Sequence, residues 1–561
     1  MRLDKLTIGS AKDSRTHQFK NLKDVTIDFD QDHWVTVMIG WNGTGKSNVL
    51  EALAIIFRDL ISKKRKPEFA FKLAYRMGLG EAIRHIHIDA DPDREKDPFT
   101  IHIATDAEAR GVGTLIPFIK GEERFSALRG KTVKLTTFLA DGEPNLPRYV
   151  FSYYSGESTR MHEVFRSYLE SYDSKLRSGE DPGLKRLFYA MPVHSQFVLL
   201  AFLIQQTDVV QKFLDEHLGL DPDAGIESVL FVLRQPPWKS KAVDGDPRFW
   251  NARGVVRDFL ARLYDIALAP IEVSRRVSTS IWNEKTLQFK YLYIKDIAAL
   301  RKLVGNQAPA SFFRDLESTY VSELIEEVRI RVRLKGNDGS VTFREMSEGE
   351  QQLLTVLGLL RFTAEDESLF LLDEPDTHLN PRWCVDYLSY LKKFVGRDPE
   401  SEDNSHVVLT THNPLAIADL VKEQVQILHR DQSARTVRAE NPAVDPRGMG
   451  FSGIVTSDMF GLGSSLDKTT NDDLVELHRL SMKEELTDED RQDLKRIRQN
   501  LEGLDFNFAS RDRLEQEYLR ARFDLNKNTT FDDAILTPEN KKRALEALVQ
   551  SLLRSLQEKA D

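Results

Sequence analysis

Residues 40–47, Gly-Trp-Asn-Gly-Thr-Gly-Lys-Ser, carry the clearest chemistry in the chain. They match the pattern GxxxxGK[ST], a loop whose backbone N–H groups surround the phosphates of a nucleotide. In that pattern Lys46 reaches the β- and γ-phosphates, and the hydroxyl of Ser47 is a ligand of Mg²⁺. The sequence therefore predicts a site for ATP and Mg²⁺. Its phosphate-binding residues are expected to be Asn42, Gly43, Thr44, Gly45, Lys46, Ser47 and Asn48.

A second pair of candidate residues, Asp373 and Glu374, ends the apolar run 369–372. Such a run is typical of a buried parallel strand, and ligands of α/β sheets lie at the carboxyl ends of strands. Two adjacent carboxylates at a strand end can also be a simple cap or an ion pair. Together with the phosphate loop, they favour catalysis. We expect Asp373 to hold Mg²⁺ beside Ser47, and Glu374 to orient and deprotonate the attacking water.

Residues 347–352, Ser-Glu-Gly-Glu-Gln-Gln, begin 26 positions before Asp373 (373 − 347). A serine followed three residues later by Glu350 is the pattern of a helix N-terminus with a capping box. The positive end of such a helix can also face a phosphate group. The two interpretations are compatible, and the residues alone leave both open.

Taken together, these motifs resemble the ABC-type ATPases, and residues 347–350 resemble the SxGE form of the signature motif in the SMC- and RecF-like branch. Met346 stands where a leucine is usual, and Glu348 replaces one glycine. The resemblance implies that ATP lies between two heads of a homodimer or higher homo-oligomer. It implies these roles: signature in trans for Ser347, Gly349 and Glu350, D-loop for residues 375–380 with Asp376, and γ-phosphate contact for the switch histidine His412.

Two further elements of that family are less clear. The Q-loop is expected near residues 153–158, but this segment contains no glutamine, so its functional residue is not assigned. Residues 19–22, Phe-Lys-Asn-Leu, resemble an early phenylalanine–lysine element of the RecF-like branch. A simple strand turn explains the same letters equally well.

The pattern of apolar residues indicates how these motifs are positioned. Short strand-like runs dominate 1–155, with one helix after the phosphate loop, which predicts a β-rich N-terminal lobe of an ATPase head. Residues 156–340 read as a mainly helical insert lobe, ending in a hairpin around 336–339. Residues 341–444 alternate helix and strand, which predicts the C-terminal lobe of the head. Residues 445–561 read as a helical region, a possible partner or oligomer interface. The fold class is α/β, a P-loop NTPase head of the ABC type.

Composition and spacing narrow the function classes. The chain has 561 residues, a formal net charge of −10 and a single cysteine, Cys384. No signal peptide or membrane-spanning run is evident, so we expect a cytoplasmic protein. Lys46 and Ser347 are 301 residues apart (347 − 46), further than in transporter domains, and no sustained heptad pattern fills the gap.

No nuclease site is predicted in this chain. The letters Asp-Ala-Asp-Pro-Asp at 89–93 could belong to a toprim site, but we expect them in a hairpin loop ahead of the insert lobe. The layout resembles the AAA-type ATPases of bacterial anti-phage defence, closest to the PtuA group of Septu and retron-associated systems. That resemblance implies a partner HNH nuclease of the PtuB kind and, in retron systems, a reverse transcriptase with its RNA–DNA product.

The alternative is a RecF-like DNA-repair clamp that binds duplex DNA directly. Such a clamp needs a basic surface. The negative net charge of the chain therefore mildly favours the defence ATPase. The best basic run, residues 63–66, is more typical of a solvated helix end. Direct binding of nucleic acid stays open at this point.

Overall fold

The structure is a computed structural model that describes most of residues 1–504. The residues outside the description are 31, 107, 109–129, 141–143, 157–158, 205–206, 221–224, 241, 279–283, 336–339, 364–366, 396–404, 431–435, 463, 482, 484–486 and 505–561. The chain divides into two compact units, Met1–Leu462 and Gly463–Asp561. Within the described part, we find no helix with the length and apolar character needed to cross a membrane.

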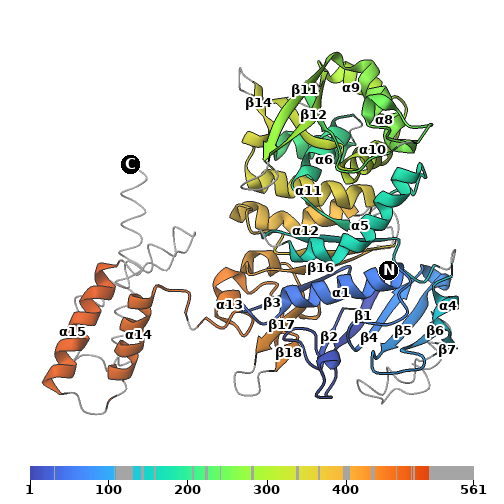
Figure 1. Cartoon of the computed structure of the whole chain (residues 1–561). Coiled ribbons are helices and arrows are strands. Elements are labelled where there is room, and N and C mark those ends of the chain that lie inside the picture. Colours follow the sequence, from blue (N-terminus) through green and yellow to red (C-terminus); the bar gives the residue numbers. More distant parts are fainter. Residues whose placement is uncertain are drawn as a thin grey trace, which may run out of the picture. The chain divides into compact units, whose positions relative to one another are not determined.

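A seven-stranded sheet forms the centre of the first unit, in the order β18-β17-β3-β16-β15-β8-β9 (Figure 1). Its strand pairs are parallel except β17–β18. Because parallel strands share one carboxyl edge, the ends of β3, β15 and β16 lie side by side there. The strands are β3 (Val35–Gly40), β8 (Tyr149–Tyr154), β9 (Leu187–Tyr189), β15 (Ser368–Asp373), β16 (His406–Thr410), β17 (Val425–Arg430) and β18 (Val437–Glu440).

A second, antiparallel sheet has the order β2-β1-β4-β5-β6-β7. Helix α1 (Lys46–Ile61) and both sheets contribute side chains to one apolar core, which explains why α1 is buried on nearly all sides. The strands are β1 (Arg2–Ile8), β2 (Val25–Asp28), β4 (Phe71–Met77), β5 (Arg84–Ala90), β6 (Phe99–Thr105) and β7 (Lys131–Val133), and the short helix α4 spans Leu135–Phe138. This is the β-rich lobe that the sequence predicts.

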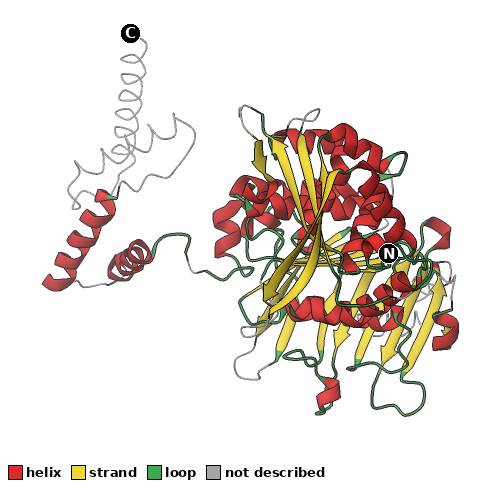
Figure 2. Cartoon of the chain, turned by 45° about the horizontal axis from the view of Figure 1, so that its top comes forward, coloured by secondary structure: helices red, strands yellow, loops and turns green. Residues whose placement is uncertain are grey.

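The insert lobe contains the expected helices and also a five-stranded antiparallel sheet, β11-β12-β10-β13-β14 (Figure 2). The hairpin of β13 and β14 is confirmed, although its turn, 336–339, lies outside the described residues. The other strands of this sheet were not predicted. Its elements are α5 (Arg160–Ser178), α6 (Val193–Ile204), α7 (Asp208–Glu216), β10 (Ile226–Arg234), α8 (Gly254–Ile266), β11 (Leu268–Ser278), β12 (Glu284–Ile294), α9 (Ile297–Val304), α10 (Pro309–Val321), β13 (Ile325–Arg333) and β14 (Ser340–Thr342).

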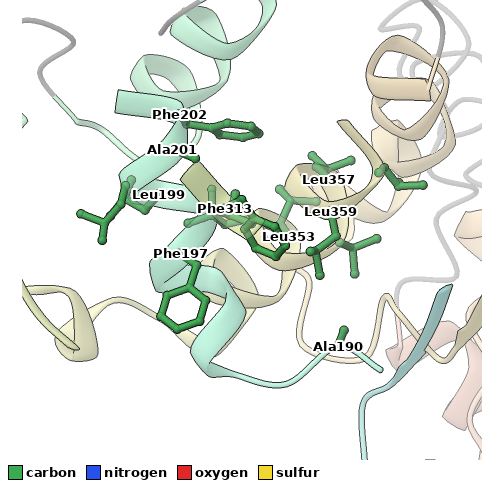
Figure 3. Packing of buried hydrophobic residues seen from close by; sticks show 14 of the residues in the cluster. Ala190, Phe197, Leu199, Ala201, Phe202, Phe313, Leu353, Leu357 and Leu359 are labelled. Carbon is green, nitrogen blue, oxygen red and sulfur yellow. The ribbon is translucent and has the colours of Figure 1, made fainter. Parts of the chain in front are cut away.

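Helix α11 (Glu348–Thr363), which starts at the signature motif, is anchored in the core of this unit. Figure 3 shows leucines of α11 beside Phe197 and Phe202 of α6 and Phe313 of α10. A Cβ at Gly358 would lie 2.0 Å from a methyl carbon of Val198, so the close approach of α11 to α6 requires glycine. The start of α11 is therefore fixed by packing along its length. Helices α12 (Pro381–Val395) and α13 (Gly450–Thr456) complete the unit.

Three ionisable side chains form a buried cluster inside the insert lobe. Glu317 of α10 contacts Lys185 Nζ through Oε1 and lies 2.7 Å from His194 Nε2 through Oε2. The N–H of Met191 donates to Nδ1 of His194, so the neutral ring carries its proton on Nε2. Burial disfavours the Glu317 anion, but the two partners outweigh it and hold the pKa of Glu317 at about 2. The cluster joins three segments of the lobe. Loss of one partner would destabilise the fold, because it would leave a buried charge unpaired.

The second unit is helical within its described part. Helices α14 (Lys468–Ser481) and α15 (Asp488–Gly503) pack through Leu480, Leu494, Ile497 and Leu501. The remainder of the expected C-terminal region, 505–561, lies outside the described residues.

Candidate functional site

The loop after β3 has the backbone geometry of an anion-binding loop. Gly40, Gly43 and Gly45 have φ values of +143°, +82° and +100°, a region that favours glycine. A Cβ at Gly40 would lie 2.4 Å from the carbonyl oxygen of Leu428. Helix α1 starts at Lys46, so the N–H groups of its first turn face the loop. The loop can thus surround an anion with N–H donors at a positive helix end.

Lys46 reaches across the loop to the neighbouring strand end. Its Nζ donates to the carbonyl oxygen of Gly40 at 2.8 Å and lies 2.9 Å from His412 Nε2. Burial lowers the pKa of Lys46, while Glu374 and Asp373 oppose that shift. Lys46 and His412 are 366 positions apart in the sequence, and the adjacent strands β3 and β16 bring them together.

Asp373, at the end of β15, meets the hydroxyl of Ser47. Ser47 Oγ donates to Asp373 Oδ1 at 3.1 Å, and Thr410 Oγ1 donates to the same oxygen at 2.5 Å. Within the described residues, the buried Oδ2 accepts no hydrogen bond, although a guanidinium nitrogen of Arg160 lies 3.6 Å from it. Burial raises the pKa of Asp373. A hydroxyl beside a carboxylate oxygen with spare acceptor capacity is a donor set that fits Mg²⁺.

Glu374 follows Asp373 in a left-handed backbone conformation, with φ +51°. Its N–H donates to both the carbonyl and the hydroxyl oxygen of Thr410, each at 3.1 Å. For a non-glycine residue this conformation costs about 1–2 kcal/mol, and such strain is typical of functional sites. The chain therefore turns at the strand end, and β16 holds the turn in place.

The carboxylate of Glu374 lies 3.4 Å from His412 Nε2. The same nitrogen is near Lys46, so it accepts from the ammonium when neutral and donates to the carboxylate when protonated. A hydrogen bond from His412 and the charges of His412 and Lys46 hold the pKa of Glu374 below its usual range, against the effect of burial. Glu374 is thus ionised near neutral pH, as a general base must be.

The expected D-loop is tied to the segment after β16. Thr411 Oγ1 donates to Asp376 Oδ2 at 2.7 Å, and Asp376 is buried, which raises its pKa. The side chain of Asp376 therefore points into its own head. An open cleft beside it is lined by Glu374, Asp376, Thr377, Leu379, Thr411, His412, Asn413 and Pro414.

The start of α11 has the predicted capping box. Ser347 N–H donates to Glu350 Oε2 at 2.8 Å, and Glu350 N–H donates to Ser347 Oγ at 3.3 Å. A Cβ at Gly349 would lie 2.5 Å from the carbonyl oxygen of His378, so glycine allows α11 to approach the D-loop. Ser347 is exposed, and no hydrogen bond between described residues joins it to the phosphate loop. Among the described residues, Gly349 and Glu350 likewise have no hydrogen bond or ion pair with the phosphate loop, Asp373, Glu374 or His412.

Arg160 is a site residue that sequence reasoning missed. It is the first residue of α5, two positions after the segment 153–158 where the Q-loop was expected, of which 157–158 lie outside the described residues. Besides its contact with Asp373, its Nε lies 3.9 Å from Glu51 Oε2, and its guanidinium is 5.2 Å from the centre of the Tyr154 ring. A lone arginine at a helix start has no sequence signal, because only the fold places it near the carboxylates.

The element at 19–22 supports the phosphate loop. Asn21 accepts from Asn48 Nδ2 at 2.6 Å through its Oδ1 and donates to the Gly43 carbonyl at 3.2 Å through its Nδ2. Lys20 Nζ lies 2.5 Å from Glu51 Oε2 in α1. The segment is a tight turn, as its letters allowed, and the turn also contacts the loop.

Of the Asp-Ala-Asp-Pro-Asp letters at 89–93, the first two end β5 and 91–93 lie in the turn between β5 and β6, close to the hairpin loop predicted. Asp91 Oδ1 and Asp93 Oδ2 lie 3.3 and 3.0 Å from His17 Nε2, and Lys12 lies 3.2 Å from Asp91 Oδ2. These contacts with His17 and Lys12 account for the cluster, which is the one group of three potential metal ligands found among the described residues.

Comparison with known proteins gives two matching family models. The model described as "AAA ATPase domain" matches residues 17–104, and that described as "AAA domain, putative AbiEii toxin, Type IV TA system" matches residues 203–418. These ranges contain the phosphate loop and all other candidate site residues except Arg160. The chain is accordingly related to AAA-type ATPases.

Two curated proteins are similar over parts of the chain. "Septu protein PtuA" of Bacillus mycoides is 24% identical over 157 residues, 26% of this chain and 21% of the relative. "Probable peptide export ATP-binding protein YydI" of Bacillus subtilis is 27% identical over 85 residues, 15% of this chain and 39% of the relative. The chain thus spans about a fifth and two fifths of their lengths. The resemblance to PtuA is confirmed as a weak similarity.

Among solved structures, the "SMC head domain from Thermotoga maritima" is 12% identical and covers 79% of this chain and 100% of its own, with a TM-score of 0.31. At this score the likeness is too distant to inform function.

Proposed function

We propose that this chain binds ATP with Mg²⁺ at the carboxyl edge of its central sheet and hydrolyses the γ-phosphate. One observation carries the proposal: three separate segments bring Lys46, Ser47, Asp373, Glu374 and His412 within hydrogen-bond or ion-pair distance of one another. A phosphate loop, a metal-binding carboxylate and a second, ionised carboxylate are the parts that phosphoryl transfer to water requires. The similarity to AAA-type ATPases supports the same activity.

Each residue has a role that its surroundings allow. The loop N–H groups and Lys46 would bind the phosphate oxygens, with Lys46 leaving the Gly40 carbonyl for the nucleotide. Ser47 and Asp373 would hold Mg²⁺, which neutralises charge on the phosphates when bound. Glu374, whose pKa is lowered by its neighbours, would orient the attacking water and take its proton. His412, beside both Lys46 and Glu374, would contact the γ-phosphate.

We further propose that a second copy of the chain completes the site. Ser347 and Glu348 are exposed at the start of α11, and Gly349 is held against the D-loop of the same chain. The N-terminus of α11 is therefore available to a partner, and its N–H groups suit the γ-phosphate of the partner's nucleotide. A symmetric homodimer would contain two such sites.

The cellular role that we propose is regulation of a partner nuclease in anti-phage defence. The support is the weak similarity to PtuA. On this proposal an HNH nuclease of the PtuB kind, and in a retron system a reverse transcriptase with its RNA–DNA product, would bind the ATPase, with residues 445–561 as a candidate interface. The alternative is a RecF-like clamp on duplex DNA.

Hydrolysis is tested first on the purified chain, by phosphate release with and without Mg²⁺. Lys46→Ala is expected to lose ATP binding, and Asp373→Asn is expected to lose Mg²⁺-dependent turnover. Lys212→Ala, an exposed lysine of α7, serves as the matched control. Turnover by Lys46→Ala at the control's rate would refute the site. Copurification with an HNH nuclease encoded beside this chain then tests the partnership, and its absence together with tight duplex-DNA binding would favour the clamp.

A further inference from the structure

The five-stranded sheet of the insert lobe has two different faces. Through the strand registers, Phe231, Leu292 and Val328 lie on one face, and all three are buried in the main core. Neighbouring positions on the same strands point to the opposite face, because side chains alternate along a strand. Helices α8 and α9 contact this sheet, and its long strands lie in front of helices in Figure 2. On the face opposite the core, Ser228 and Val232 of the central strand are buried, and exposed apolar side chains lie toward the edge formed by β11 and β12.

Aromatic side chains of β12 lie on this face next to the edge strand β11, with Tyr291 half-buried and Tyr293 exposed. Tyr291 is paired with Ile271 on β11 and with Val232 on β10, so these positions share the face. Tyr293 is 39% exposed, and Ile271 on the edge strand is 57% exposed. Rings and branched chains at the surface of a sheet, rather than in its core, form a contact surface that needs a partner.

Arginines surround these rings. Arg275 of β11 places its guanidinium 5.0 Å from the ring centre of Tyr291. On β13, Arg331 and Arg333 are exposed on the same face, and neither lies within ion-pair distance of a carboxylate among the described residues. Arg329, beside them, is paired with Glu327. In a chain with a net charge of −10, this local excess of positive charge stands apart from the average surface. We call Tyr291, Tyr293, Arg275, Arg331 and Arg333 the Tyr–Arg face.

We propose that the Tyr–Arg face binds single-stranded nucleic acid. Arg331 and Arg333 would contact backbone phosphates, while bases would stack on the exposed ring of Tyr293 and on the guanidinium of Arg275, which lies over the ring of Tyr291. Rings that lie on a sheet can stack only on bases that are already unpaired, so a single strand fits better than a duplex. This surface is distinct from the nucleotide site, and the inference does not rest on the proposed ATPase activity.

The test measures the fluorescence anisotropy of three labelled oligonucleotides: an oligo-dT of about 20 nucleotides, an oligo-U of equal length and a matched duplex. This length covers several binding footprints of the size of one OB fold. Single strands are expected to bind more tightly than the duplex, with affinity falling between about 50 and 200 mM salt. Arg331→Glu with Arg333→Glu should weaken binding at least about tenfold and reduce the log–log salt slope by about 1.4. Tyr293→Ala should weaken binding about tenfold, and Tyr293→Phe, which keeps the ring, should bind like the wild type.

Arg276→Glu is the matched control, because Arg276 is exposed on the same edge strand but pairs with Thr286 on the opposite face. It should retain most of the affinity, and Lys46→Ala should leave oligonucleotide binding unchanged. The proposal is overturned if no oligonucleotide binds at low salt, or if Arg276→Glu costs as much as the double variant. Equal losses of oligonucleotide affinity for Tyr293→Phe and Tyr293→Ala would also overturn it. Tighter binding of poly-glutamate than of oligo-dT would overturn it in favour of an acidic protein partner.

Discussion

Removing one hydroxyl at the carboxyl edge of the central sheet should weaken both the fold and the site. Thr410 Oγ1 donates to Asp373 Oδ1 at 2.5 Å and accepts from the N–H of Glu374 at 3.1 Å. Thr410→Val keeps the shape of the side chain but removes both interactions. A hydrogen bond to a charged group contributes about 1.5–3 kcal/mol, and the buried Asp373 carboxylate would lose one of its two donors. We expect a loss of about 2 kcal/mol in unfolding free energy.

The same change should lower turnover, because Thr410 fixes both carboxylates. Glu374 would keep its bond to the Thr410 carbonyl but lose the second acceptor that holds its left-handed backbone. A misplacement of the general base by a fraction of an ångström is expected to reduce kcat about tenfold or more. Thermal unfolding and steady-state phosphate release at saturating ATP and Mg²⁺ would measure the two effects.

Thr355→Val is the matched control. Thr355 is also buried, but its hydroxyl donates only to the Gln351 carbonyl of its own helix, 2.7 Å away. Its loss should therefore cost less than about 1 kcal/mol, because that carbonyl keeps its helical partner. If Thr410→Val matches Thr355→Val in both stability and turnover, Thr410 does not hold the carboxylates and the reasoning about this edge of the sheet is wrong.

Three other substitutions test separate parts of the account. Glu374→Gln should keep ATP binding, abolish hydrolysis and trap an ATP-bound dimer that is visible on size exclusion. In the wild type, the lowered pKa keeps Glu374 ionised in mild acid, so its contribution to turnover should fall only below pH 4.5. A loss of turnover on the acid side near neutral pH would contradict its assignment as the general base. Arg160→Met should reduce turnover about tenfold, because it removes the cation near Asp373. The control Arg166→Met, on the same helix, should not. If the two variants hydrolyse ATP at the same rate, Arg160 has no role in the site. Lys185→Met should lower the free energy of unfolding, measured by chemical denaturation, by about 3–5 kcal/mol, because it leaves Glu317 buried without its cation. The control Lys335→Met breaks an exposed ion pair and should lower it by less than about 1 kcal/mol. Because the pKa of Glu317 is lowered to about 2, its stabilising effect is present above pH 4.5 and is lost as the pH falls toward 2; wild-type stability that is constant over this window would contradict the cluster.

Local sequence patterns predicted the parts of the site that lie next to strand ends. The phosphate loop follows β3, and the two carboxylates end β15, so their positions could be read from apolar runs followed by polar residues. The capping box at Ser347 was also readable, because it depends on residues three positions apart. The contact of Lys46 with His412 was not predicted, since nothing local sets a pairing across 366 positions; family resemblance implied only that His412 contacts the γ-phosphate that Lys46 also reaches.

Most of the sheet in the insert lobe was not predicted, and there is a physical reason for this. Residues 226–234 contain apolar side chains on both faces, a pattern that a buried helix segment shares. Strand β11 is exposed along almost its whole length and so lacks the alternation that marks a half-buried strand. Arg160 and Thr410 escaped because their roles come from the fold alone. Arginine at a helix start and threonine at a strand end are ordinary residues in those places.

Mixing two inactive variants tests the central claim, a nucleotide site completed by a second copy of the chain. Lys46→Ala removes the phosphate-binding lysine, and Ser347→Arg blocks the start of α11, so each variant alone should be inactive. In an equal mixture half of the dimers contain both variants and each keeps one intact site of two, which predicts recovery of about a quarter of wild-type hydrolysis. The absence of recovery at every ratio, with mixed dimers demonstrated by differential tags, would contradict a site shared between two chains.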